Sequence, residues 1–118
     1  MWVCVPVTNQ GGVDPRWGRA ERLALAEVEN SSVKSWEEFD VNWGVDHEIA
    51  SEARHHAHVA RFIHDHKVEV VVADHMGPGM LTMLERMGVR VVLGVGGDAH
   101  TAVVLASSGS SQQPNERQ

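Results

Sequence analysis

The protein is a chain of 118 residues, 42% hydrophobic and 22% charged, which suits one ordinary globular domain. Its formal net charge is −6 and no basic stripe runs along the chain, so we expect no nucleic-acid partner. No apolar run approaches the roughly 20 residues that span a bilayer, and no positively charged leader opens the chain, so we expect a cytoplasmic protein without a membrane partner.

The first third of the chain predicts a central strand, a long loop and a hairpin. Residues 2–7 (WVCVPV) are short, apolar and β-branched, and Pro6 indicates an irregular end to this strand. Residues 8–21 are rich in Gly, Asn, Asp and Pro, which predicts a loop. Residues 22–29 and 33–42 flank a turn signal and predict an antiparallel hairpin with one wetter face.

From residue 46 onward, helical and strand patterns alternate. The expected elements are a helix over about 48–66 capped by Asp46, a strand at 68–74, a helix at 78–87, a strand at 89–95 and a short helix within 96–108. The first helix is predicted from the spacing of Ile49, Ala53, Ala57, Ala60 and Ile63. Right-handed crossovers then give an α/β fold, a mixed sheet of about five strands with about three helices. Residues 1–107 form one domain, and the polar tail 108–118 is expected to be disordered.

Three loops are expected to meet at one edge of this sheet. In wound α/β sheets, ligands bind outside the carboxyl ends of the parallel strands. The loops at residues 8–20, 74–79 and 94–98 all follow predicted strands at that end. The sequence therefore predicts a binding site where these loops converge.

Two of these loops carry distinctive motifs. The first reads Gly12-Val13-Asp14-Pro15-Arg16-Trp17-Gly18-Arg19-Ala20, and the second reads Asp74-His75-Met76-Gly77-Pro78. With these motifs, the chain over about residues 1–106 resembles the nitrogenase iron–molybdenum cofactor biosynthesis family. That family includes the NifX-type proteins and the carboxyl-terminal domain of NifB-type proteins. Trp17 stands where phenylalanine is commoner, and Asp74 where glycine is commoner.

The resemblance implies a ribonuclease H-like, three-layer α/β fold. It also implies a non-enzymatic accessory role, in which the protein binds, stores or delivers an anionic metal–sulfur cluster or precursor of the iron–molybdenum type. A protein that donates or accepts the cluster is then an expected partner. The sequence has no set of strand-borne carboxylates for two magnesium ions and no nucleophile–base pair, so we expect no nuclease or other enzyme.

The candidate cofactor-binding residues come from the three loops. They are Asp14, Arg16, Trp17, Arg19, His75, Met76, Gly77, Pro78, Gly79, Gly96 and Gly97. His75 either coordinates a metal or fastens its loop through a backbone carbonyl. Gly77 and Gly79 either bring the N–H groups of a helix start to an anion or form a tight turn.

The arginine-bearing loop also has two interpretations. Arg16 and Arg19 flank Trp17, and together they offer two guanidinium groups and a flat apolar wall to a bulky anion. Alternatively, Asp14 pairs locally with an arginine and Trp17 caps the core. The segment at residues 94–100 (GVGGDAH) is only a weak phosphate-loop signal, because it lacks the Lys-Ser/Thr pair.

Eight histidines and no tyrosine suggest a second class of function, a histidine-based module that binds or senses zinc, copper or nickel. The candidate metal ligands are His75, Met76, His100, His55 and His58. His55 and His58 lie three residues apart on the expected helix, where a solvated helix face is the alternative. His56 falls within the apolar arc and is expected to be half-buried. Such a module could bridge two copies, and a homodimer through the hairpin edge or the face bearing Trp36 and Phe39 is a further expectation.

The sulfur-bearing residues are expected to fill the core. The single cysteine, Cys4, lies in the first strand and is expected to be a small buried hydrophobic residue. Methionines recur at helical spacing at positions Met76, Met80, Met83 and Met87. Core filling is the usual reason for such a stripe, and a copper(I) ladder of thioethers is the alternative.

Overall fold

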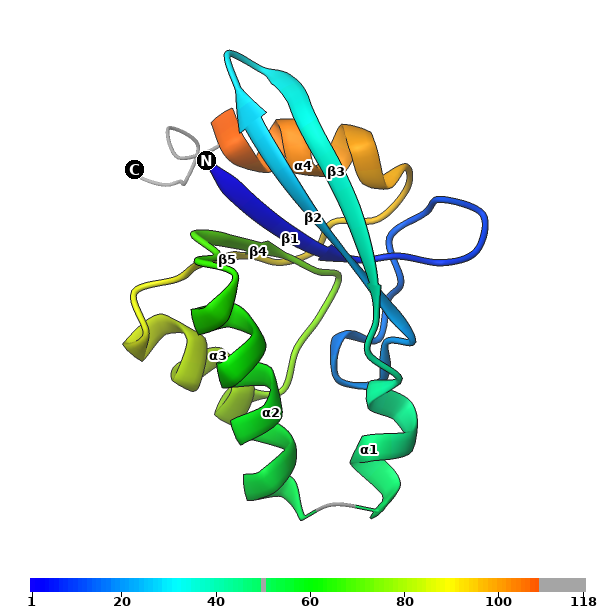
Figure 1. Ribbon diagram of the computed structural model, residues 1–118, viewed down its shortest axis with the longest axis vertical. Helices are drawn as coiled ribbons and strands as arrows, with labels where there is room; N and C mark the ends of the chain where they lie inside the picture. Colours follow the sequence, from blue (N-terminus) through cyan, green and yellow to red (C-terminus); the bar gives the residue numbers. More distant parts are fainter. Residues whose placement is uncertain (50, 109–118) are drawn as a thin grey trace.

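A computed structural model of the protein describes residues 1–49 and 51–108 (Figure 1). In chain order the elements are β1 (Trp2–Pro6), the 3-10 helix η1 (Trp17–Arg19), β2 (Arg22–Glu29), β3 (Ser32–Asp40), α1 (Trp43–Ile49), α2 (Glu52–Asp65), β4 (Val70–Val72), α3 (Pro78–Arg86), β5 (Arg90–Val92) and α4 (Ala99–Ser108). Of the tail expected to be disordered, 109–118 lies outside the described residues. None of the described helices is long and apolar enough to cross a membrane.

The strands form one mixed sheet in the order β3-β2-β1-β4-β5. Strand β1 is central, since Cys4 lies opposite Leu25 of the antiparallel β2 and opposite Val71 of the parallel β4. Strand β5 runs parallel to β4, and β3 completes the hairpin with β2. The predicted five-stranded mixed sheet and its central first strand are confirmed.

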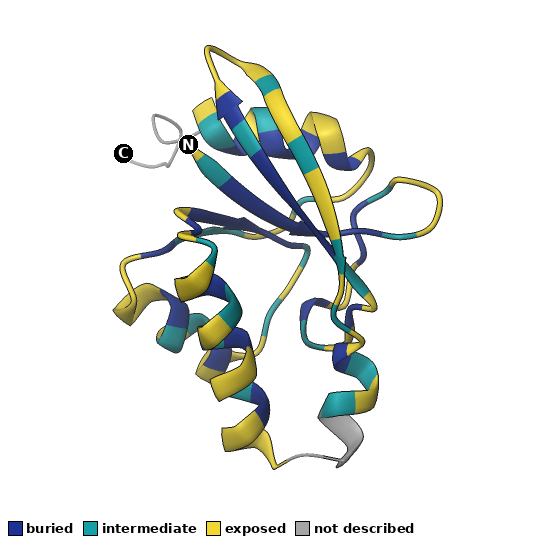
Figure 2. Ribbon diagram, in the orientation of Figure 1, coloured by how far each residue is buried: buried dark blue, intermediate teal, exposed yellow. Residues whose placement is uncertain are grey.

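Helices cover both faces of the sheet, so the fold has three layers (Figures 1 and 2). Because side chains alternate along a strand, Val3 and Val5 of β1 pack on one face and Cys4 on the other. Val3 and Val5 join a core with α4, and Cys4 joins a second core with α2 and α3. Cys4 is fully buried, as expected. Figure 2 shows that β1 is mostly buried, whereas the edge strand β3 is largely exposed.

The prediction of one helix over 48–66 is wrong, because the chain forms two helices there. Helix α1 ends at Ile49, and α2 begins at Glu52 with Ser51 as its N-cap. The Ser51 hydroxyl oxygen accepts a hydrogen bond from Arg54 N at 3.1 Å, which satisfies a free N–H at the new helix start. Asp46 is therefore not the cap and lies inside α1. The described residues contain four α-helices instead of about three.

The predicted apolar stripe of this helix is also partly wrong. Helix α2 buries His55, Val59 and Ile63, whereas Ala53 and Ala57 are exposed. The larger side chains of Val59 and Ile63 bury more apolar area than alanine, so they face the core.

The methionines in and next to α3 mostly contact the core. Met80 is buried, Met76 and Met83 pack against the same core as Cys4, and Met87 at the end of the helix is 37% exposed. The core-filling prediction is thus confirmed for Met80 and Met83 and wrong for Met87, whose place beyond the last turn leaves it in solvent; Met76, which precedes the helix, is half-buried against the same core.

Candidate functional site

The three predicted loops do lie side by side at one edge of the sheet. Val13 N donates a hydrogen bond to Gly97 O at 2.8 Å, and Gly94 N donates to Asp74 O at 2.7 Å. A parallel bridge joins the backbones of Arg16 and His75. We call these paired segments, residues 11–16, 74–75 and 94–98, the rim. The predicted convergence is confirmed, and backbone hydrogen bonds between the loops hold it together.

Glycines allow the loops to approach this closely. Gly97 has a φ of 80°, a left-handed conformation that other residues adopt only with strain. A Cβ added at Gly12 would lie 3.4 Å from Gly97 O, so the two loops are in contact through their backbones. The loops of the rim are therefore joined to one another through their backbones.

In the first loop, one side chain stabilises the loop by local hydrogen bonds, and two arginine side chains are exposed to solvent. Asp14 is buried, and its Oδ1 accepts a hydrogen bond from Arg16 N at 3.0 Å and lies 3.7 Å from Arg16 Nε. Asp14 thus pairs locally, as the alternative interpretation predicted. Arg16 is 62% exposed at its side chain, and Arg19 is also exposed. The two arginines line a shared hollow of about 220 Å³, whereas Trp17 is buried and lines a different cavity.

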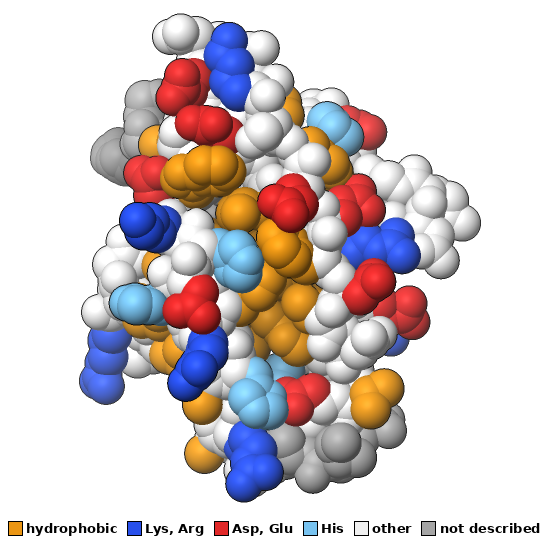
Figure 3. All heavy atoms as spheres, viewed as in Figure 1, with side chains coloured by type: hydrophobic (Ala, Val, Ile, Leu, Met, Phe, Trp, Pro, Cys, Tyr) orange, Lys and Arg blue, Asp and Glu red, His pale blue; other side chains and the backbone are white. Residues whose placement is uncertain are grey.

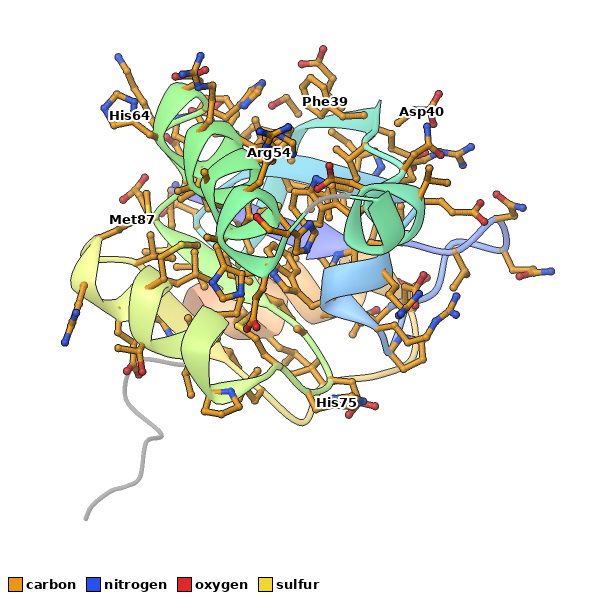
Figure 4. The ribbon with its side chains drawn as sticks, turned by 90° about the horizontal axis from the view of Figure 1, so that it is seen from below. Phe39, Asp40, Arg54, His64, His75 and Met87 are labelled. Carbon is orange, nitrogen blue, oxygen red and sulfur yellow. The ribbon has the colours of Figure 1, made fainter. Side chains whose placement is uncertain are left out.

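His75 is exposed on the rim. In Figure 4 it lies at one side of the molecule, while His64 of α2 and Phe39 of β3 lie at the opposite side. Gly96 and Gly97, in the neighbouring loop, are likewise exposed. The backbone bridge thus places two exposed residues, Arg16 and His75, next to each other at the edge where ligands bind in wound sheets.

A cavity of about 230 Å³ adjoins the rim. Its walls are Trp17 and Gly18 of η1, the start of α2 with Glu52, His55 and His56, and residues 76–80. Trp17 follows Arg16 and Met76 follows His75, so the residues after the bridge turn from the rim into the cavity wall.

The start of α3 lines this cavity and has backbone N–H groups with no partner within the helix. Gly77 is the N-cap and makes no side-chain capping bond, and Pro78 follows at the first helical position. The first N–H groups of a helix have no partner within the helix, and here they belong to Gly79 and Met80. The predicted helix start at Pro78 is confirmed, and the tight-turn and anion-binding interpretations of Gly77 and Gly79 are compatible with this geometry.

Behind the cavity, one carboxylate holds two histidines. Asp46 Oδ2 lies 2.7 Å from His55 Nδ1, and Asp46 Oδ1 lies 2.8 Å from His58 Nδ1. The hydrogen bond from His55, followed by that from His58, holds the pKa of Asp46 below its ordinary value. With Asp46 ionised, both Nδ1 atoms carry protons and donate to it. This link between α1 and α2 was missed from the sequence, because nine and twelve residues separate Asp46 from its partners.

The predicted metal ligands do not form one site. His58 lies beside a groove whose floor includes Trp43 and Phe62, seen as the hydrophobic hollow in the middle of Figure 3. His100 stacks on Trp36 of β3, with ring centroids 3.7 Å apart. His55 faces the cavity and His75 the rim. Within residues 1–49 and 51–108, no group of three or more His, Cys, Asp or Glu side chains is placed to hold a metal ion.

Residues 1–109 match the family described as dinitrogenase iron-molybdenum cofactor. The chain belongs to this family. The resemblance inferred from the two loop motifs is therefore confirmed, and both motifs contribute to the rim and the cavity. No curated protein is significantly similar to the chain in sequence.

Solved structures share the fold of this family member. The protein PH0822 is 24% identical with a TM-score of 0.70, and 88% of each chain is covered. The apo form of the orange protein from Desulfovibrio gigas is 20% identical with a TM-score of 0.67, covering 87% of this chain and 82% of that one. A Thermotoga protein provisionally assigned to NifB is 21% identical with a TM-score of 0.67, covering 92% and 88%. At these identities the likeness establishes the fold alone.

Proposed function

We propose that the protein is a non-enzymatic, cytoplasmic accessory protein that binds and carries a metal–sulfur cluster, or its precursor, of the iron–molybdenum type. Membership of the dinitrogenase iron-molybdenum cofactor family supports the class of cargo. The observation that carries the proposal is the backbone bridge between Arg16 and His75, which makes these two exposed residues neighbours on the rim. On the same resemblance we assign the three-layer fold to the ribonuclease H-like type.

The donor set of the rim suits an anionic cargo. Arg16, which lies on the rim near Asp14, and Arg19, which lines the hollow beside it, carry guanidinium groups that can donate several hydrogen bonds to a bulky anion. His75 supplies one nitrogen ligand for a metal at the surface of the cluster. Gly96 and Gly97 leave the backbone open to close approach. Of the other predicted cofactor-binding residues, Asp14 fastens the loop, and Trp17 and 76–79 form the cavity wall behind the cargo.

The same donor set suits a carrier better than a permanent holder. One imidazole and several hydrogen bonds hold a cluster less firmly than a cage of thiolates, and the single cysteine, Cys4, is buried away from the rim. A cargo held at an exposed edge can pass to a second protein. We therefore propose a cluster donor or acceptor protein as the partner that meets the rim.

The test is anaerobic loading of the apo-protein with iron, molybdate and sulfide, followed by desalting. We expect visible charge-transfer absorption and a fixed metal content per chain in the unaltered protein. His75→Ala should lose most of both, because it removes the one nitrogen ligand at the rim. His64→Ala is the matched control, because His64 is 82% exposed and lies on the opposite side of the molecule (Figure 4).

The outcome separates the proposal from nonspecific loading. Equal loss of absorption in both variants would mean that colour comes from histidines in general. A colourless protein under every loading condition would refute the cluster proposal. Arg16→Gln should weaken loading and make it less sensitive to salt, because it removes one charge that attracts the anion.

The alternative function, a zinc, copper or nickel module built on His55 and His58, finds no support in the geometry. Both Nδ1 atoms face the same Asp46 carboxylate, so the pair is joined by hydrogen bonds and is not arranged around an open metal position.

A further inference from the structure

Strand β3 is an open edge of the sheet. It is the last strand in the order β3-β2-β1-β4-β5, so within the described part of the chain no strand lies beside its backbone groups that point away from β2. Figure 2 shows that β3 is largely exposed along its length. Such an edge is a template for a further strand. We propose that β3 pairs antiparallel with β3 of a second copy of this chain, about a twofold axis that passes Trp36.

The charges along β3 are complementary to themselves in this register. With Trp36 opposite Trp36 of the second copy, Lys34 lies opposite Glu38, and the twofold axis repeats this pair. Ser35 lies opposite Glu37 in the same way. Each carboxylate of the central stretch therefore faces a lysine or a serine and never another carboxylate. Opposite charges directly across two antiparallel strands stabilise their pairing.

The neighbouring registers are less favourable. Side chains alternate between the two faces of a sheet and opposite residues share a face, so the axis must pass a residue and not the space between two residues. An axis at Glu37 would place two copies of this carboxylate opposite each other, and like charges in that position are destabilising. An axis at Ser35 would place Lys34 opposite Trp36, which leaves the lysine without a carboxylate across from it. The charge pattern therefore selects the axis at Trp36.

The side chains at the centre of this edge are held in place before any pairing. Trp36 is half-buried, its ring stacks on that of His100 with centroids 3.7 Å apart, and its Nε1 donates a hydrogen bond to Glu38 Oε2 at 2.9 Å. Aromatic pairs across two strands add to the stability of the ladder. Lys34 is exposed and has no partner in β2, because the ladder shifts register there. Since such a bulge commonly ends a ladder, we expect the new ladder to run from Lys34 to Glu38.

The size of this interface predicts a weak dimer. A ladder over residues 34–38 buries little surface, and interfaces below roughly 1,200 Å² are typical of transient association. Each copy carries a net charge of −6, and physiological salt screens this repulsion beyond about 8 Å. We therefore expect a reversible dimer with a dissociation constant between about 1 μM and 1 mM. In Figure 4, Phe39 and Asp40 of β3 lie on the side of the molecule opposite His75, so the dimer leaves both rims open.

The test is analytical ultracentrifugation of the apo-protein at physiological ionic strength, over concentrations from about 1 μM to 1 mM. Lys34→Glu and Glu38→Lys should each raise the dissociation constant by more than about tenfold, because each places like charges opposite one another in both pairs. When these two variants are mixed in equal amounts, they should dimerise with each other, because every pair then has one acidic and one basic member. Glu37→Lys is the matched control, since it changes the charge equally but faces Ser35, and it should not weaken the dimer.

The mixing experiment separates the proposed register from loss of folding, because two misfolded variants would not restore each other. An unaltered protein that stays monomeric up to the highest concentration would overturn the proposal. A dimer that is equally stable in Lys34→Glu and Glu38→Lys, or a mixture of the two that stays monomeric, would also overturn it. No cluster is present in this test, so its failure leaves the cargo proposal for His75 standing, and a colourless loading experiment leaves the dimer proposal standing.

Discussion

The carboxylate of Asp46 is expected to be a main stabilising link between α1 and α2, and Asp46→Ala tests this. The substitution removes the acceptor of a 2.7 Å hydrogen bond from His55, a side chain that is 2% exposed. It also removes the acceptor of a 2.8 Å hydrogen bond from His58, which is 50% exposed. The two bonds differ in burial, so they should differ in energy.

The magnitude follows from that difference. A hydrogen bond from a buried donor to a charged acceptor contributes about 1.5–3 kcal/mol, and its loss leaves the His55 N–H buried without this acceptor. The exposed bond to His58 contributes roughly 0.2–1 kcal/mol. Alanine regains roughly 0.5 kcal/mol of helix propensity relative to aspartate. Asp46→Ala should therefore lower the free energy of unfolding by about 1–3.5 kcal/mol.

The assay is urea unfolding followed by tryptophan fluorescence and circular dichroism. His58→Ala is the control, because it removes only the exposed bond and should cost less than about 1 kcal/mol. The double variant completes the cycle and gives the coupling energy of Asp46 with His58; the effect of Asp46→Ala in the His58→Ala background then reports the remaining bond to His55. If Asp46→Ala costs no more than His58→Ala, the buried hydrogen bond does not contribute as reasoned here.

Because Asp46 has a lowered pKa, we expect the stability of the folded protein to depend on pH. The hydrogen bond from His55, then that from His58, lowers the pKa of Asp46 in the folded protein. Its contribution is therefore present above about pH 4, the region of the unfolded-state pKa, and is lost as the pH falls through the lower folded-state value. The difference in free energy of unfolding between the unaltered protein and Asp46→Ala should be constant between about pH 5 and pH 6. It should shrink as the pH falls below about 4.

Three further outcomes are expected. Gly97→Ala should cost about 1–2 kcal/mol in urea unfolding because its φ is 80°, whereas Gly96→Ala, in open space with no positive φ, should be nearly neutral; equal costs would contradict the strain argument. Leu84→Ala should lower the free energy of unfolding by about 2–5 kcal/mol because the side chain is fully buried. A smaller loss would mean that neighbouring side chains fill the space that the leucine leaves. Burial raises the pKa of the Cys4 thiol, so a thiol reagent should label it only in denaturant, and rapid labelling of native protein would contradict the burial.

The sequence alone determined the sheet and the edge at which the three loops meet. The short β-branched segment around Cys4 and the continuous apolar runs near Val71 and Val91 predicted buried parallel strands, because such strands are covered on both faces. The carboxyl ends of parallel strands share one edge of the sheet, so the strand order alone predicts that the loops bearing Arg16 and His75 lie close together. The family was also recognisable from motifs in the same loops.

The tertiary structure alone decided which histidines face the candidate site. Ser51 restarts the helix, and packing against α3 and the sheet then turns His55 inward and leaves Ala53 exposed. The partner of His55, Asp46, lies on another helix. Hydrophobic spacing describes one helix at a time and carries no information on how two helices meet. The cavity shared by Trp17, His55 and Met76 therefore exists only once three distant segments have packed together.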